Sequence, residues 1–145
     1  MALHLIKLCV GAESVKDLTD WIRERLRDKK QRGLPVEHVH TTRMMPKRGD
    51  ELLDGGSLYW VIRGEIACRQ RLKAIRPIVD KDGIGRCELV LDRKIVPVHP
   101  RVYRAFQGWR YLDPKDAPPD LTESASGLAV MPENLRRELR ELGLL

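Results

Sequence analysis

Two neighbouring segments, residues 58–62 and 66–75, constrain the fold of this chain more than any other part of it. The first, Leu-Tyr-Trp-Val-Ile, is apolar throughout and follows a Gly-Gly-Ser turn at residues 55–57. Aromatic and β-branched residues of this kind are typical of a strand. Only Arg-Gly-Glu, at residues 63–65, separates it from the second segment. We therefore predict two successive strands, the first belonging to the core, with Trp60 in it.

The second of these strands is apolar on one side and basic on the other. Successive strand residues point to opposite faces, so every second residue shares a face. One face then carries three cations: Arg69, Arg71 and Lys73. Same-face neighbours lie about 6.6 Å apart, which resembles the phosphate spacing along one nucleic-acid strand. The alternative is a solvated face on which Glu88 or Asp92 of a neighbouring strand balances the cations.

The distribution of charge points to the same region. The formal net charge is +6, and residues 43–110 alone hold 15 Lys or Arg against 8 Asp or Glu. A basic protein concentrates near polyanions, which include nucleic acid, an anionic membrane surface and an acidic protein. A basic surface without a specific ligand is equally compatible with these numbers.

Length and cysteine usage narrow the class of protein. The 145 residues suit a single domain over residues 1–145 with a core of its own. Three scattered cysteines make no disulfide framework and no zinc spacing. No apolar run approaches the length of a membrane span, and the amino terminus does not resemble a signal peptide. We expect a cytoplasmic protein with no membrane partner and no cofactor.

The rest of the chain predicts an α+β fold. Ser14 is a suitable N-cap for an amphipathic helix that runs to about Lys30, with Gly33 after its end. Alternating patterns predict further strands at residues 3–10, 35–44 and 86–92, the last extended by 94–98 after a bend. Pro97 must then lie at an edge or a bulge. Residues 113–130 are predicted to form an acidic surface loop, and 132–145 a carboxyl-terminal helix. Runs of strands with helices at either end favour a curled or barrel-like, mostly antiparallel sheet.

Two further basic stretches are candidate nucleic-acid contacts. A loop near the Gly-Gly turn contains Arg43, Lys47 and Arg48, and residues 106–111 interleave aromatic side chains with arginine, including Trp109 and Arg110. Such stretches stack bases on rings or guanidinium planes and pair with phosphates. For Trp109, packing in the core is the alternative.

Candidates for catalysis are sparse. His38 and His40 share one strand face at a spacing that can hold a metal ion, but no further ligand follows at a characteristic distance. Asp50 and Glu51, near two cations, could form an acid–base or magnesium cluster. The alternative is a helix start matched to its dipole. The sequence identifies no reaction.

Three stretches resemble a family of short bacterial proteins known only as a domain of unknown function. They are residues 3–11, 54–64 and 106–112, with the sequences LHLIKLCVG, DGGSLYWVIRG and FQGWRYL. The resemblance covers nearly the whole chain. It implies a bacterial, cytoplasmic origin and carries no activity with it.

The order of elements over residues 43–75 is also similar to that of PUA-like barrels, including the ASCH type, which bind RNA or modified bases. There a loop leads into a glycine turn, an apolar strand and a second strand. The Gly-Lys-Glu-Arg signature of the ASCH type is absent, so no pocket or catalytic residue follows from this similarity.

We therefore expect a small basic protein that binds nucleic acid, RNA rather than DNA, through an arginine-rich sheet face. Two alternatives stay open. One is an enzyme that processes nucleotides or nucleic acid. The other is a protein-interaction adaptor, including a homodimer, whose basic face meets an acidic partner.

Overall fold

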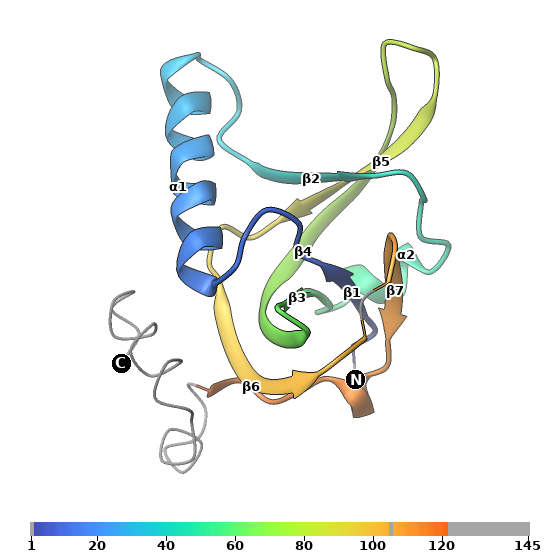
Figure 1. Ribbon diagram of the computed structural model, residues 1–145. Helices are drawn as coiled ribbons and strands as arrows, with labels where there is room; N and C mark the ends of the chain where they lie inside the picture. Colours follow the sequence, from blue (N-terminus) through green and yellow to red (C-terminus); the bar gives the residue numbers. More distant parts are fainter. Residues whose placement is uncertain (1, 105, 122–145) are drawn as a thin grey trace.

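The computed structural model describes residues 2–104 and 106–121 (Figure 1). Its elements are β1 (His4–Leu8), α1 (Val15–Gln31), β2 (His38–Thr42), α2 (Gly49–Leu53), β3 (Ser57–Ile62), β4 (Glu65–Val79), β5 (Gly85–Leu91), β6 (Val96–Val102), β7 (Trp109–Leu112) and the 3-10 turn η1 (Pro114–Asp116). Neither helix in this part of the chain has the length and apolarity needed to cross a bilayer.

The seven strands in the described part of the chain form one mixed, open sheet. Its order is β2-β5-β4-β3-β1-β7, and β6 pairs separately with β4. β1 and β3 run parallel and the other pairs are antiparallel, so the prediction of a mostly antiparallel sheet is confirmed. β2 and β7 are the edges of this sheet and do not pair with each other. The sheet therefore does not close into a barrel. α1 stands along one side, and the β4–β5 hairpin extends away from the body (Figure 1).

β3 is the centre of the core, as its apolar sequence predicts. All six of its residues are buried, and because alternate residues face opposite ways, the strand contributes to two apolar clusters. Leu58 and Trp60 join the cluster that α1 covers, whereas Tyr59 and Val61 join the cluster on the other face, with residues of β1, β4, β6 and β7. In the first part of β4, buried and more exposed residues alternate, as expected.

α1 begins and ends at the residues that its sequence indicates. The Ser14 hydroxyl accepts a hydrogen bond from the Asp17 backbone N–H at 3.0 Å, which satisfies one of the unpaired donors of the first turn. Gly33, just beyond the helix, has a φ of +70°, a conformation that suits glycine after a helix end. Val15, Leu18 and Ile22 are buried against the sheet.

Residues 96–102 differ from the prediction. They do not extend β5 but form a separate strand, β6, that pairs antiparallel with residues 65–69 of β4. β4 is 15 residues long, so β5 and β6 occupy successive parts of its length. Pro97 is tolerated because β6 has β4 as its only strand partner among the described residues, and the register shifts nearby.

The predicted acidic loop over residues 113–130 is described only as far as residue 121. That part contains η1, and Asp120 and Leu121 are buried, so it does not lie wholly on the surface. The predicted helix over residues 132–145 lies outside the described residues.

Gly56, just before β3, lies where the backbone of two other segments leaves no room for a side chain. A Cβ atom added there would overlap the backbone carbonyl oxygens of Leu3 and Leu52, which belong to packed segments and cannot move independently. We expect Gly56→Ala to lower the free energy of unfolding by about 3 kcal/mol or more. At Gly85 an added Cβ meets nothing within 4 Å, so Gly85→Ala should change stability by less than about 1 kcal/mol. Urea denaturation of both variants checks this, and equal effects would contradict it.

Candidate nucleic-acid interface

The basic loop and the aromatic strand, about sixty residues apart in sequence, meet at one edge of the sheet. The Trp109 indole N–H donates to the Met44 carbonyl oxygen at 2.7 Å. The Tyr111 hydroxyl accepts from the backbone N–H groups of Lys47 and Arg48 at 3.0 and 3.1 Å. β7 therefore holds the loop over residues 43–48 in place. We call the exposed part of these two segments the loop–β7 surface.

Cations line this surface. Arg43, Lys47, Arg48 and Arg110 are all exposed. The Arg48 guanidinium lies 5.5 Å from the centre of the Tyr111 ring, and that of Arg110 lies 4.6 Å from the centre of the Phe106 ring. Stacked guanidinium groups of this kind offer a flat face to a base. That of Arg110, which forms no ion pair within the described residues, can also donate to a phosphate.

Trp109 has the packing role considered from the sequence, and its stacking on a base stays a prediction. It is half-buried, packs against the core cluster under α1 and meets Tyr111 edge to face, with ring centres 4.9 Å apart. The Trp109 N–H donates to Met44 and is therefore not available to a ligand. Because the ring is half-buried, only part of its surface is open. Trp60, by contrast, is buried and donates to Gln70 at 2.9 Å, which confirms it as a core residue.

Arg69 does not belong to an open basic face, and this corrects the sequence-based assignment. Its guanidinium makes a two-point ion pair with Asp120, at 2.8 and 2.6 Å, and donates to the Ser57 hydroxyl at 2.9 Å. The pair is largely buried, the side chains being 24% and 10% exposed. A guanidinium held in this way is not available to a phosphate. The sequence could not reveal it, because Asp120 lies 51 positions away.

Arg71 and Lys73 are exposed, as the alternation predicts, and neither forms an ion pair within the described residues. Glu88, considered as a cross-strand partner for them, pairs instead with Arg76 at 3.4 Å. Of the three cations predicted on this face of β4, Arg71 and Lys73 thus stay candidates.

His38 and His40 lie side by side on the inner face of β2. His40 meets the Trp60 ring edge to face, with ring centres 5.2 Å apart. The Nε2 atoms of both imidazoles are buried and have no hydrogen-bond partner among the residues that the structure describes. Burial, followed by the positive charge of Arg25, lowers the pKa of His38 to about 4. Burial also lowers the pKa of His40 to about 4, and the positive charge of Lys7 is the second cause. Nearby cations disfavour a metal ion, and no cluster of three metal-ligating side chains occurs in residues 2–104 and 106–121.

Asp50 and Glu51 stand at the exposed start of α2. Glu51 pairs with Arg48, with Nη2 and Oε1 3.0 Å apart, and this hydrogen bond holds the pKa of the Glu51 carboxyl below its usual range. A carboxylate stabilised in its charged form by an adjacent guanidinium is a poor proton acceptor. The helix-start interpretation of these residues therefore has the better support.

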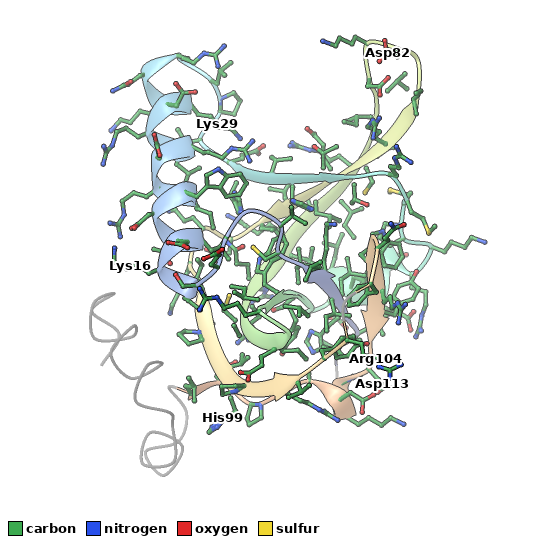
Figure 2. The ribbon with its side chains drawn as sticks, in the orientation of Figure 1. Lys16, Lys29, Asp82, His99, Arg104 and Asp113 are labelled. Carbon is green, nitrogen blue, oxygen red and sulfur yellow. The ribbon has the colours of Figure 1, made fainter. Side chains whose placement is uncertain are left out.

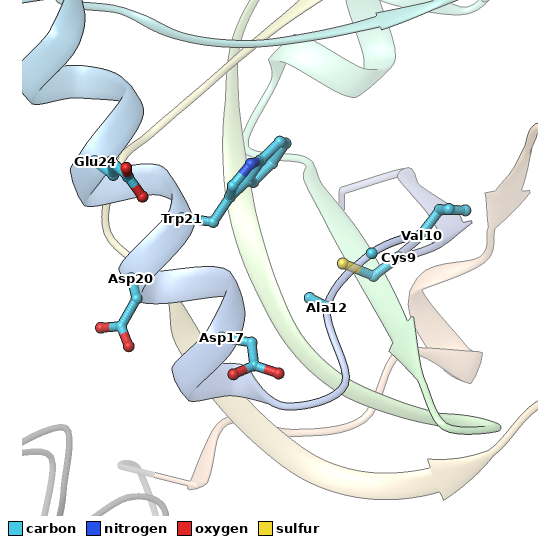
Figure 3. Close-up of a pocket in the computed structure, with 8 residues that line it drawn as sticks. Cys9, Val10, Ala12, Asp17, Asp20, Trp21 and Glu24 are labelled. Atoms are coloured by element: carbon cyan, nitrogen blue, oxygen red, sulfur yellow. The ribbon is translucent and has the colours of Figure 1, made fainter.

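A pocket of about 290 Å³ lies between residues 9–12 and α1 (Figure 3). Asp17, Asp20 and Glu24 on its helix wall repel an anion. Burial raises the pKa of the Cys9 thiol to about 11, so the thiol stays protonated and is a weak nucleophile at neutral pH. The lining of this pocket therefore suits neither nucleic-acid binding nor catalysis by a cysteine thiolate.

The sequence reasoning missed a second basic feature beside β7. A hollow of about 440 Å³ is lined by Arg101, Tyr103, Arg104, Arg110, Asp113 and Asp116, among others; we call it the arginine hollow. Arg104 and Asp113 are labelled in Figure 2, below β7. The signal available in the sequence was three arginines within ten residues, but their convergence depends on how β6 turns back to β7.

Comparison with known proteins identifies the family. The model of a family described as a protein of unknown function, DUF1489, matches residues 5–145, and the chain belongs to that family. This confirms the resemblance to an uncharacterised family. No curated protein and no solved structure matches the chain, so the similarity to PUA-like barrels stays a prediction.

The Tyr111 hydroxyl should control the order of the basic loop. Tyr111→Phe removes the acceptor of two backbone N–H groups, at a cost of about 1 kcal/mol, while the ring stays in place. We expect faster amide hydrogen exchange at Lys47 and Arg48, with little change in the β3 amides. Tyr103→Phe, which leaves the loop contacts intact, is the control. Unchanged exchange at Lys47 and Arg48 would show that other contacts hold the loop.

The buried histidines should make the fold sensitive to acid. Their pKa values are near 4 in the folded chain and about 6.5 when unfolded, so below pH 6.5 the unfolded chain binds more protons. Stability is therefore full above pH 6.5 and falls as the pH drops towards 4, by about 2 kcal/mol for each imidazole between pH 7 and pH 5.

Urea denaturation at pH 7 and pH 5 checks this expectation. His38→Leu with His40→Leu should remove most of the difference between the two pH values, because both buried imidazoles are then absent. An equally large difference in the double variant would assign the acid sensitivity to other groups.

Proposed function

We propose that this member of the DUF1489 family binds single-stranded nucleic acid, RNA in preference to DNA, across the loop–β7 surface. The observation that carries the proposal is the tethering of the loop by Trp109 and Tyr111. It joins two basic segments into one surface and holds the loop backbone, so that less conformational freedom is lost on binding.

The charge on this surface supports a polyanionic partner. Arg43, Lys47 and Arg110 form no ion pair within the described residues. Arg48 is in part balanced by Glu51. The surface thus keeps cations that neighbouring carboxylates do not neutralise, in the segment where the excess positive charge of the whole chain is concentrated.

The aromatic groups favour a single strand over a duplex. Half-buried rings with stacked guanidinium groups offer flat faces to unpaired bases, whereas the bases of a duplex are already stacked on one another. Base stacking on such groups is worth roughly 1–3 kcal/mol per base. The preference for RNA and the likeness to PUA-like barrels are parts of this proposal that rest on the sequence.

Charge-removing variants test the location. The triple variant Arg43→Gln, Lys47→Gln and Arg110→Gln should weaken binding to a single-stranded RNA of about 16 nucleotides at least tenfold. Each lost phosphate contact should also flatten the slope of log K against log salt by about 0.7. The control triple, Arg23→Gln, Arg27→Gln and Lys30→Gln, removes the same charge from exposed positions of α1 and should have a much smaller effect.

Fluorescence anisotropy at several salt concentrations, with RNA and the matching DNA, measures both quantities. The variant Arg71→Gln with Lys73→Gln shows whether β4 contributes. Equal losses in the two triple variants would mean that net charge alone attracts the strand. The absence of binding to either probe at low salt would refute the proposed function.

A further inference from the structure

Three arginine side chains line the arginine hollow. None of Arg101, Arg104 and Arg110 forms an ion pair within the described residues. Arg101 donates to the backbone carbonyl oxygen of Asp116 at 2.7 Å, and Arg110 stacks on Phe106. Like charges brought together repel, and an anion placed among them relieves that repulsion.

The two carboxylates that line the hollow do not supply this anion. Asp113 accepts a hydrogen bond from the Lys115 backbone N–H at 3.4 Å and so acts as the cap of η1. Asp116 contributes its backbone carbonyl to Arg101. Both carboxylates are too far from the three guanidinium groups to form an ion pair with them.

Aromatic surface completes the site. Tyr103 lines the hollow and meets Phe106 edge to face, with ring centres 5.5 Å apart. Its backbone N–H donates to the Gly64 carbonyl oxygen at 2.9 Å, which fixes its position against the β3–β4 turn. The hollow therefore offers a positioned aromatic ring beside several guanidinium donors.

We propose that the arginine hollow binds a nucleoside phosphomonoester, either as a free nucleotide or as the terminal nucleotide of a strand. A phosphomonoester carries close to two negative charges at pH 7, against one for a phosphodiester, and guanidinium groups bind it through paired N–H donors. A volume of about 440 Å³ is within the range of small-ligand pockets. The strand-end form rests on the proposed function, because it places the end of a bound strand beside the loop–β7 surface.

Calorimetric titration of the full chain with four kinds of probe tests this proposal. The probes are inorganic phosphate, adenosine, adenosine 5′-monophosphate, and a short single-stranded RNA with a 5′-phosphate, a 3′-phosphate or no terminal phosphate. We expect the monophosphate to bind at least tenfold more tightly than adenosine or phosphate alone. Its affinity should rise between about pH 5 and pH 7.5, as the second proton leaves a phosphate of pKa near 6. One phosphorylated RNA should bind at least tenfold more tightly than the RNA without a terminal phosphate.

Variants connect these results to the hollow. Arg101→Gln with Arg104→Gln should abolish the advantage of a terminal phosphate and leave binding of the unphosphorylated RNA within about twofold, because both residues lie outside the loop–β7 surface. Arg93→Gln with Lys94→Gln removes the same charge from exposed positions. This control should change neither the advantage of a terminal phosphate nor the binding of the unphosphorylated RNA. Loss of the phosphate advantage in this control as well would overturn the assignment to the hollow.

The remaining outcomes separate the two proposals. If unphosphorylated RNA binds and neither the monophosphate nor a terminal phosphate adds affinity, the hollow is not a phosphomonoester site, while the proposed function stands. If the monophosphate binds and no RNA does, the hollow is a site for free nucleotides and the proposed function is wrong.

Discussion

The ion pair between Arg69 and Asp120 organises much of this molecule. The Arg69 guanidinium also donates to the Ser57 hydroxyl on β3. The Ser57 backbone N–H in turn donates to His4 Nδ1 on β1 at 3.0 Å. Asp120 itself forms a bridge with Val98 on β6. Four strands, β1, β3, β4 and β6, are thus joined to the segment after η1 by this network beneath the surface. A paired charge is tolerated there because both guanidinium edges are satisfied, whereas either partner left alone would be strongly destabilising.

This network also decides where the chain can present positive charge. Because Arg69 and Arg76 pair with carboxylates, the cations of β4 that have no ion pair within the described residues are Arg71 and Lys73. Exposed cations lie instead around β7, an edge strand with the tethered loop and the arginine hollow beside it. A loop held on a rigid sheet is a common position for a binding site, and the loop–β7 surface has that arrangement.

Several parts of the fold follow from local sequence, and others do not. The Ser14 cap and Gly33 place α1, because helix ends are set by hydrogen bonds within a few residues. The alternation in residues 66–73 places the exposed and buried sides of β4. The separate strand β6 could not be derived in this way, because a strand's partner depends on the whole sheet. The candidate site was predictable in part: Arg43, Lys47, Arg48, Trp109 and Arg110 were singled out, but their meeting was not, nor was the role of Arg101 and Arg104.

The sequence by itself determined the buried centre of the sheet, the amphipathic helix, the excess of positive charge in residues 43–110 and membership of a family. These depend on side-chain type and on spacing along the chain. Only the tertiary structure decided which cations are free. A guanidinium that lies within hydrogen-bonding distance of a carboxylate is neutralised, and one that lies in a hollow without such a partner is not. That distance is set by residues as far apart as Arg69 and Asp120, or Met44 and Trp109, and no local pattern records it.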